Sequence, residues 1–463
     1  MAEVRGVIAA DKADPGSAGQ GQAGRDAFSP SYRAYALWLL LFIYTLNFLD
    51  RTIINILAEP IKNELGLRDW QIGMMSGLAF ALFYTVLGIP IARLAERRNR
   101  PLIIAASLAV WSGFSALCGL AQGFGQLVLA RIGVGIGEAG CTPAAHSLIA
   151  ETTPREKRAS SLAFYSLGIP LGSLAGMAFG GFVADAFGWR MAFVLAGAPG
   201  LLLALVAALS LREPRKYQAA LTDAPGQDTI SFRAAMAELA GKRSFWWMAM
   251  GAALTAFLSY GNGAFLGSFF FRVHGPQLAE LAEGLARAAG VSLGPAGVLG
   301  PALGLLIGVA GGLGTYMGGR IADRAARRDI AGYMTLCAVT SVLGVPFMVL
   351  ALVSHEALAA LGLLVVPVLC NAAWYGPVYA AAQSIVRPRT RATAAAILLF
   401  IINLIGLGLG PLCVGALSDV LAASGLGSTE GLRWSLLGCS VVAFIAAGCF
   451  WRARIPLRGE VVS

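Results

Sequence analysis

Long apolar runs separated by short polar segments fill the chain from residue 34 to residue 453. A helix needs about 20 apolar residues to cross the hydrocarbon core of a bilayer. On that measure the runs predict an all-α polytopic membrane protein with twelve transmembrane helices. A polar stretch divides the predicted spans into two groups of six, so we expect two six-helix bundles.

The polar stretches also predict the limits of the domains. Residues 1–33 are rich in Gly, Ala, Asp and Ser and have no signal-peptide core, so we interpret them as a disordered tail. The bundles then cover 34–211 and 244–453, joined by a linker over 212–243 and followed by a tail over 454–463. Within the linker, the FRAAMAELAG segment predicts a short amphipathic helix at the membrane surface, and PQLAELAEGLARAAG, at 276–290, predicts a helical continuation of the seventh span.

Basic residues set the expected orientation. They cluster after every second span, around Arg93, Arg158, Arg324, Arg387 and Arg452, and are scattered on the other side. Because cytoplasmic loops retain Lys and Arg, both termini are expected in the cytoplasm and the chain in the cell inner membrane. The net charge of +10 is thus explained by topology, and we expect no nucleic-acid partner.

Composition excludes several other classes. The chain is 57% hydrophobic and 13% charged, with a mean hydropathy of +0.70, which is too apolar for a soluble protein of this size. Its seven cysteines form no CxxC motif and its three histidines are scattered, so we expect no metal and no cofactor. A membrane enzyme acting on lipids is disfavoured, because the sequence has neither an HExxH motif nor a clustered set of His and Asp residues.

The two halves repeat each other. ARLAERRNRP, at 92–101, aligns with GRIADRAARR, at 319–328, and GGFVAD, ending at Asp185, aligns with VGALSD, ending at Asp419. A duplicated pair of six-helix bundles is a transporter architecture, with the substrate site at the interface between the halves.

These repeated loops resemble the loop motifs of the major facilitator superfamily, as do RIGVGIG in the fourth span, GIPLGSLAGMAFGG in the fifth and GWRMAF at the start of the sixth. Within that superfamily, NFLDRTIINIL and RIGVGIGEAGCTPAAHSLIAETTPREKRASSLAFYSLG are similar to segments of the spinster family. The resemblance implies an alternating-access carrier of lysolipids or sphingoid-type lipids that is coupled to protons. It also implies roles for Asp50, Arg51, Arg131 and Glu138.

Those four charges lie inside the most apolar stretches of the chain. An ionised side chain at the bilayer centre costs roughly 2.5–3.5 kcal/mol, and charges retained at that cost are usually functional. Arg131 and Glu138 are seven residues apart and share a helix face, and Asp50 is expected at the depth of Arg131. We hypothesise that Asp50 and Glu138 exchange a proton and compete for Arg51 and Arg131. The alternative is a static salt bridge within the first bundle.

The repeated loops predict a cytoplasmic gate. Charge pairs at these helix ends can latch the two halves together in one state. The candidate gate residues are Arg93, Glu96, Arg97, Arg320, Asp323 and Arg324. The competing explanation for the arginines is retention of positive charge in the cytoplasm.

A substrate cavity is expected to be lined by polar and aromatic side chains of the apolar spans, although some of these can simply join helices by hydrogen bonds. The candidates are Tyr44, Asn47, Tyr84, Tyr165, Tyr260, Asn262, Asn371, Trp374, Tyr375, Tyr379, Gln383 and Asn403. A few cations among apolar walls suit an amphiphile. The sequence therefore predicts a monomeric, proton-coupled carrier of a lipid-like substrate that works among membrane lipids. The alternative is a proton-coupled exporter of drugs or small organic anions on the same fold.

Overall fold

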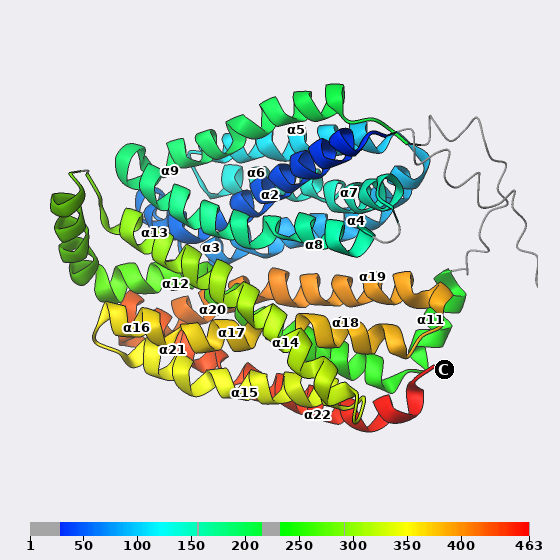
Figure 1. Cartoon of the computed structure of the whole chain (residues 1–463). Helices are drawn as coiled ribbons and strands as arrows, with labels where there is room; N and C mark the ends of the chain where they lie inside the picture. Colours follow the sequence, from blue (N-terminus) through cyan, green and yellow to red (C-terminus); the bar gives the residue numbers. More distant parts are fainter. Residues whose placement is uncertain (1–27, 155–156, 215–231, 291, 463) are drawn as a thin grey trace, which may run out of the picture.

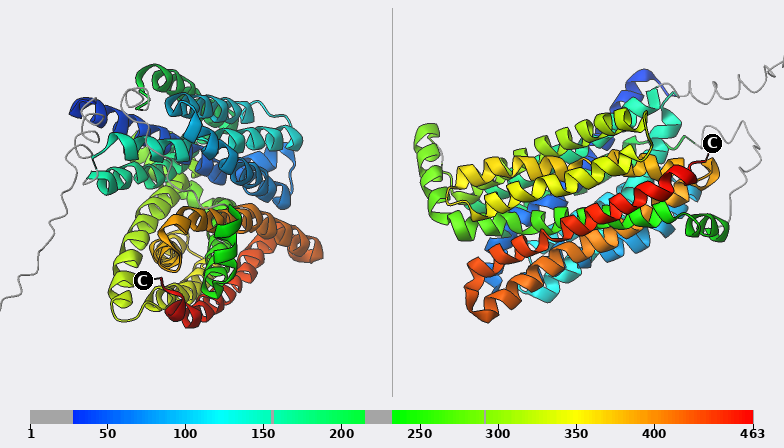
Figure 2. Two further views of the ribbon diagram at one scale, coloured as in Figure 1. Left: turned by 90° about the vertical axis from the view of Figure 1, so that its right-hand side faces the viewer. Right: turned by 90° about the horizontal axis from the view of Figure 1, so that it is seen from below.

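The computed structural model describes residues 28–154, 157–214, 232–290 and 292–462. Two helical bundles lie side by side, the first ending with α9 and the second beginning with α12 (Figures 1 and 2). The helices of the first bundle are α2 (Pro30–Leu65), α3 (Asp69–Ser76), α4 (Leu78–Arg97), α5 (Arg100–Cys118), α6 (Phe124–Glu138), α7 (Cys141–Thr152), α8 (Arg158–Ser166) and α9 (Gly168–Ser210).

The second bundle contains more short segments than the first. Its elements, preceded by α11 (Phe232–Ala240), are α12 (Arg243–Ala289), α13 (Pro295–Leu305), η2 (Leu306–Ala310), α14 (Gly311–Ala326), α15 (Gly332–Val353), α16 (Ala357–Leu363), α17 (Val365–Ala372), α18 (Tyr375–Ser384), η3 (Pro388–Thr390), α19 (Arg391–Ile401), η4 (Ile402–Leu409), α20 (Gly410–Leu421), η5 (Ala422–Leu426), α21 (Gly427–Cys439) and α22 (Val442–Glu460). The described residues include no β-strand, which confirms the predicted all-α class.

Helix limits follow from local sequence signals. Ser29 caps α2 by accepting a hydrogen bond from the backbone N of Tyr32, and Gly66 ends the helix with a φ of 63°. Eight helical segments of the described chain are long and apolar enough to cross a membrane. Two of these, 160–210 and 388–460, are broken at Gly188 and Gly425, so each covers two predicted spans.

Both predicted amphipathic helices are present. The FRAAMAELAG segment forms α11, and α12 continues to Ala289. The helical conformation of α12 is interrupted at His274, just before Pro276, and the segment beyond this kink stands at one end of the molecule (Figure 1). On that segment, the side chain of Leu278 is buried whereas that of Leu285 is exposed.

Glycines let the helices of the first bundle approach closely. A Cβ on Gly135 of α6 would lie 2.6 Å from the carbonyl oxygen of Phe80, and one on Gly137 would lie 2.5 Å from the backbone N of Trp111. Gly172 and Gly176 of α9 likewise abut the backbone of α2. These glycines therefore serve helix packing, and this packing brings α2, α4, α5 and α6 around Glu138.

The two bundles share a core at one end only. One cluster of buried residues joins both halves, including Ile53 and Ile56 of α2 with Phe265 and Phe269 of α12. We call this end of the molecule the seam end. Of the two further clusters, one lies almost wholly in the first half and the other in the second.

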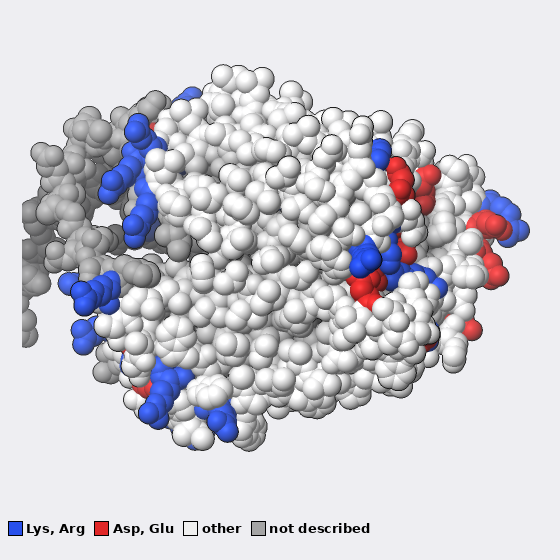
Figure 3. Space-filling model, turned by 180° about the vertical axis from the view of Figure 1, so that it is seen from behind, with Lys and Arg blue, Asp and Glu red and all other residues white. Residues whose placement is uncertain are grey.

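The opposite end, which we call the basic end, carries the exposed Arg93, Arg97, Arg320, Arg324 and Arg452. Figure 3 shows basic side chains gathered at this end, both signs of charge at the seam end, and a broad uncharged band between them. A band of this kind is the surface expected of a protein surrounded by lipid.

Candidate coupling and substrate site

An ion pair inside the first bundle joins two of the predicted coupling residues. Nε of Arg51, on α2, donates to Oε2 of Glu138, on α6, at 2.5 Å. The Glu138 side chain is fully buried and that of Arg51 is 16% exposed. The second carboxylate oxygen of Glu138, Oε1, has no hydrogen-bond partner among the described residues. The pair therefore neutralises a buried carboxylate while leaving one of its oxygens unsatisfied.

Aromatic rings enclose the Arg51 guanidinium. Its Cζ lies 4.4 Å from the ring centre of Tyr84, 5.0 Å from that of Phe80 and 5.2 Å from that of Phe48. A guanidinium within about 6 Å of a ring centre is attracted by the ring quadrupole. Arg131 lies 5.3 Å from the centre of the same Phe80 ring, so this ring contacts both cations.

Asp50 and Arg131 occupy the dry interior beside this pair. Asp50 is 1% exposed and accepts a hydrogen bond from the Ser115 hydroxyl at 2.7 Å. Arg131, also 1% exposed, donates from Nε to the carbonyl oxygen of Met75 at 3.4 Å, and its Nη1 has no partner within the described structure. Arg131 interacts electrostatically with both Asp50 and Glu138, but no ion pair within 4.0 Å joins it to either carboxylate.

Five of the predicted cavity residues gather around Arg51. Tyr44 stacks on Tyr165 with ring centres 4.3 Å apart, and Arg51, Tyr84 and Tyr260 all interact electrostatically with Tyr44. Asn47, 1% exposed, lies beside the Glu138 carboxylate. These residues form a patch of phenol and amide groups around the ion pair.

Tyr260 links this patch to the second bundle. Its ring packs against both the first-half core cluster and the second-half cluster. It interacts with Tyr375 and Tyr379 of α18, and Tyr375 stacks on Trp374 with ring centres 4.1 Å apart. The aromatic candidates of both halves therefore meet at the interface between the bundles.

The remaining candidates lie elsewhere. Asn262 and Asn371 line a pocket of about 40 Å³ inside the second bundle, together with Thr340 and Ser440. Gln383 is exposed near the end of α18. Asn403 lies in η4, where it is partly buried.

The five gate residues whose side chains the structure describes are exposed, and no ion pair among them joins the halves. Arg320 donates to the Tyr316 hydroxyl at 2.7 Å, and Asp323 accepts from the Tyr333 hydroxyl at 3.3 Å; all four residues belong to the second half. Arg93, Arg97 and Arg324 have exposed side chains, and no ion pair between described gate residues is present. The side chain of Glu96 lies outside the described part of the structure.

Sequence reasoning missed a buried network at the basic end. Arg100, whose side chain is 0% exposed, pairs with Glu151 at 2.6 Å and also with Glu213, and its Nη1 donates to the Ser147 hydroxyl at 2.8 Å. The repeated loop motif at 92–101 contains Arg100, but the acidic partners of Arg100 are 51 and 113 residues away in the sequence. Only the folded arrangement identifies them.

A second missed cluster joins the halves at the seam end. Arg272 of α12 binds Glu59 of α2 at 2.8 Å and Asp69 of α3 at 2.7 Å, and Lys62 binds Asp69 at 2.6 Å. The sequence had shown Lys62 and Arg272 only as scattered basic residues. The available signal was the position of these residues: Arg272 lies at the end of a predicted span and Lys62 in the short loop after another. A charge so close to the bilayer core needs a partner of opposite charge.

Two helical bundles that enclose buried charges at their interface form the architecture of a secondary transporter. The sequence profile described as Major Facilitator Superfamily matches residues 40–411. The chain therefore belongs to the major facilitator superfamily.

Relatives cover nearly the whole chain. It is 33% identical to an MFS-type efflux pump of Mycolicibacterium smegmatis over 439 residues, which is 94% of this chain and 96% of that protein. It is 27% identical to Protein spinster homolog 1 of Homo sapiens over 93% of this chain and 82% of that protein. These relatives are transporters, and their similarity supports a transport function and not an enzymatic one.

A solved structure resembles the fold closely. The crystal structure of a bacterial homologue of the human lysosomal transporter spinster, in an inward-facing and unoccupied conformation, matches with a TM-score of 0.81. The two chains are 32% identical, and the match covers 94% of this chain and 100% of that one. The resemblance to spinster proteins predicted from the sequence motifs is confirmed.

Proposed function

We propose that this protein is a proton-coupled, alternating-access carrier of a lipid-like amphiphile, in which Glu138 accepts the coupling proton. The observation that carries the proposal is the ion pair between Arg51 and Glu138. A carboxylate buried in a bundle core is held ionised by its cation, and when a proton binds the carboxylate the cation loses its partner.

The proton then changes what Arg51 can bind. With Glu138 ionised, the Arg51 guanidinium is neutralised within the first half. With Glu138 protonated, the guanidinium keeps its charge and its aromatic enclosure but is free to bind an anionic group of the substrate. Asp50, one residue earlier and held by Ser115, is the second proposed proton site, with Arg131 as its nearby cation.

We assign the basic end to the cytoplasm, which also places both termini there and the chain in the cell inner membrane. The halves are packed and ion-paired at the seam end, through Arg272 with Glu59 and Asp69, while the exposed gate residues at the basic end form no such pair among the described residues. This arrangement supports an inward-facing state, as does the likeness to an inward-facing relative.

The substrate class follows from the surroundings of Arg51. One cation amid tyrosine and phenylalanine rings suits an anionic head group that carries an apolar chain. The resemblance of the sequence motifs to the spinster family implies a lysophospholipid or a sphingoid-type lipid, which belongs to the same class. The second candidate is an exporter of drugs or small organic anions. The similarity of this chain to an MFS-type efflux pump, which extends over 96% of that pump's length, supports this candidate.

Transport into proteoliposomes with an imposed pH gradient tests both candidates. The panel comprises a lysophospholipid, a sphingoid base, a cationic dye and a small organic anion. We expect the lysophospholipid to move with the gradient in the parent chain and to lose gradient dependence in Asp50→Asn and Glu138→Gln. Movement of the dye or the small anion without any lipid movement would replace the first candidate by the second.

A further inference from the structure

A pocket of about 40 Å³ lies inside the second bundle, between α12, α15, α17 and the break that joins α21 to α22. Two amides and three hydroxyl groups form its polar lining: those of Asn262, Thr340, Ser341, Asn371 and Ser440. The other described residues that line it are apolar, and none of the lining residues carries a charge. A space of about 10–15 Å³ holds one water molecule, so this pocket has room for a small ion but not for an organic ligand.

The three hydroxyl groups can act only as acceptors toward the pocket, because their hydrogens are already used. Thr340, Ser341 and Ser440 each donate to the carbonyl oxygen four residues earlier in the chain, at 3.0, 2.8 and 3.0 Å. A hydroxyl group has one hydrogen and two lone pairs. Only lone pairs therefore remain on these oxygens for a ligand.

Asn262 supplies a fourth acceptor. Its Oδ1 atom is buried and has no hydrogen-bond partner among the described residues. A buried acceptor without a partner destabilises the fold, so a ligand that binds it is favoured. One water molecule donates two hydrogen bonds and would leave two of the four oxygens unserved, whereas a cation attracts all four at once.

The uncharged lining indicates the charge of the cation. Protein sites for Ca²⁺ and Mg²⁺ include carboxylates, and no carboxylate lines this pocket. Neutral oxygens bind monovalent cations in channel filters and at the broken helices of transporters. The small volume favours Na⁺ over the larger K⁺.

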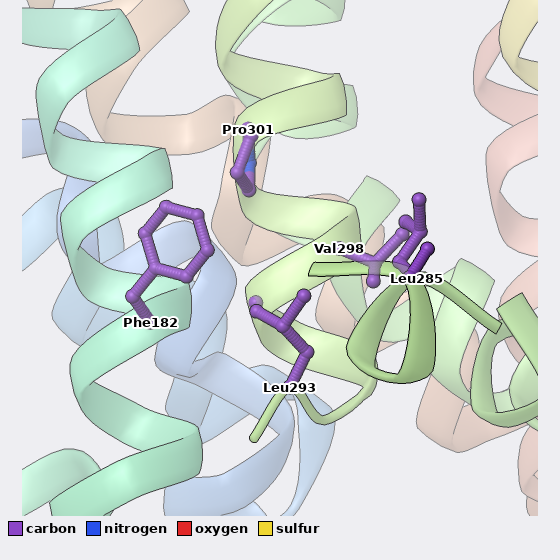
Figure 4. A pocket seen from close by; sticks show the side chains of 7 residues that line it. Phe182, Leu285, Leu293, Val298 and Pro301 are labelled. Atoms are coloured by element: carbon purple, nitrogen blue, oxygen red, sulfur yellow. The ribbon is translucent and has the colours of Figure 1, made fainter. Parts of the chain in front are cut away.

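A larger pocket at the seam end shows that a polar lining is not general in this molecule. It has a volume of about 410 Å³, and Figure 4 shows Phe182 across from Pro301 and Leu293 in it. All seven residues that line this pocket are apolar or glycine, so their side chains offer no oxygen to a cation. The polar side chains of the smaller pocket, in contrast, converge from four separate segments.

The depth of the smaller pocket suits an ion site. Thr340 and Ser341 lie near the middle of α15, and Asn262 follows Tyr260 by two residues in α12. Ion sites of secondary transporters lie near the bilayer midplane. The pocket therefore lies at the expected depth, directly behind the helix that carries Tyr260 to the interface between the bundles.

We propose that this pocket binds one Na⁺ ion, through Oδ1 of Asn262, the hydroxyl oxygens of Thr340, Ser341 and Ser440, and the amide oxygen of Asn371. The site is separate from the Arg51–Glu138 pair, and the inference goes beyond the proposed function without depending on it. An ion held from four segments ties α12 to the outer helices of the second bundle.

Binding of radioactive Na⁺ to the full chain in lipid nanodiscs tests this inference. We expect saturable binding by the parent chain. We also expect a lower unfolding temperature when N-methyl-D-glucamine replaces Na⁺ at constant ionic strength, because an ion that binds only the folded state stabilises it. Without saturable binding, water alone fills the pocket and the proposal is overturned.

Two matched variants of α15 locate the ion. Thr340→Val removes a hydroxyl of the pocket, whereas Thr335→Val removes one that donates to the Ala331 carbonyl oxygen at 2.9 Å and does not line the pocket. We expect Na⁺ affinity to fall about tenfold in Thr340→Val, the effect of losing one partner of a charged group, and to stay unchanged in Thr335→Val. Equal affinities in the two variants would contradict the assignment.

Asn262→Leu removes the acceptor that has no protein partner, and we expect it to weaken Na⁺ binding by at least about tenfold. Loss of binding in Glu138→Gln instead would place the ion in the first bundle and overturn the proposal. Thermal unfolding of each variant in Na⁺-free buffer checks that the bundles remain folded. Because binding is measured without substrate or a pH gradient, failure of the Na⁺ proposal is distinguishable from failure of the transport proposal.

Discussion

Asp50 and Arg51 are neighbours in the chain, yet they bind partners on different helices. Asp50 accepts from Ser115 of α5, whereas Arg51 donates to Glu138 of α6. Consecutive side chains on a helix point about 100° apart, so one turn of α2 presents a carboxylate and a guanidinium to two separate environments. This separation lets α2 contribute a carboxylate to one buried site and a cation to another.

The Arg51–Glu138 pair gives a prediction about stability. Arg51→Ala removes the cation from a fully buried carboxylate, and we expect a loss of about 3–5 kcal/mol in the free energy of unfolding. Arg51→Ala combined with Glu138→Gln should recover part of that loss, because the second change removes the buried charge. Chemical unfolding in detergent micelles measures both. A double variant less stable than Arg51→Ala would contradict the ion-pair account.

Helix packing at Gly135 gives a second prediction. Gly135→Ala places a Cβ 2.6 Å from the Phe80 carbonyl oxygen, and we expect a cost of about 1–3 kcal/mol from overpacking. Gly113→Ala in α5 is the matched control, since nothing lies within 4 Å of its Cβ position. That control should be neutral or slightly stabilising through helix propensity. Equal destabilisation of the two variants would show that the contact with Phe80 is unimportant.

Two ion pairs at the basic end should behave differently when broken. Arg100→Gln removes a guanidinium whose side chain is 0% exposed and which binds both Glu151 and Glu213, and we expect a loss of about 3–5 kcal/mol in the free energy of unfolding. Arg458→Gln breaks an exposed pair with Asp329, and we expect no measurable change in the unfolding temperature. Similar losses in the two variants would refute this distinction.

The pair of Asp329 and Arg458 also gives a prediction about pH. The hydrogen bond from Arg458 lowers the pKa of the Asp329 carboxyl from 3.8 to about 2. Because this folded-state pKa is lowered, the pair stabilises the fold above about pH 4 and loses that contribution as the pH falls toward 2. The parent and Arg458→Gln should therefore show the same pH dependence of unfolding between pH 5 and pH 8. A difference that grows within this window would contradict the assignment.

Much of the fold could be predicted because a helix that crosses a bilayer must be apolar over about 20 residues. The lengths of the apolar runs predicted the all-α class, and the paired motifs ending at Asp185 and Asp419 predicted the duplication. The breaks at Gly188 and Gly425 fall between predicted spans, but the sequence did not identify these two residues as the ones that adopt a positive φ. The sequence contains too many glycines for these two to be distinguished by residue type alone.

The site was predicted in part. Charges inside apolar runs singled out Arg51 and Glu138, and the structure brings them together. The assignment of roles to Asp50, Arg131 and the gate residues stays a prediction. Partners such as Arg272 with Glu59 were missed because they are 213 residues apart, and no local pattern identifies which charges meet across two bundles.

The central claim is that proton transfer at Glu138 is linked to substrate movement. The most direct measurement uses proteoliposomes loaded with a pH-sensitive dye, to which the transported lipid is added without a pH gradient. The account predicts a change in internal pH with the parent chain and none with Glu138→Gln, while substrate-for-substrate exchange persists in both. An unchanged proton signal in Glu138→Gln would contradict the claim and assign the ion pair with Arg51 a purely structural role.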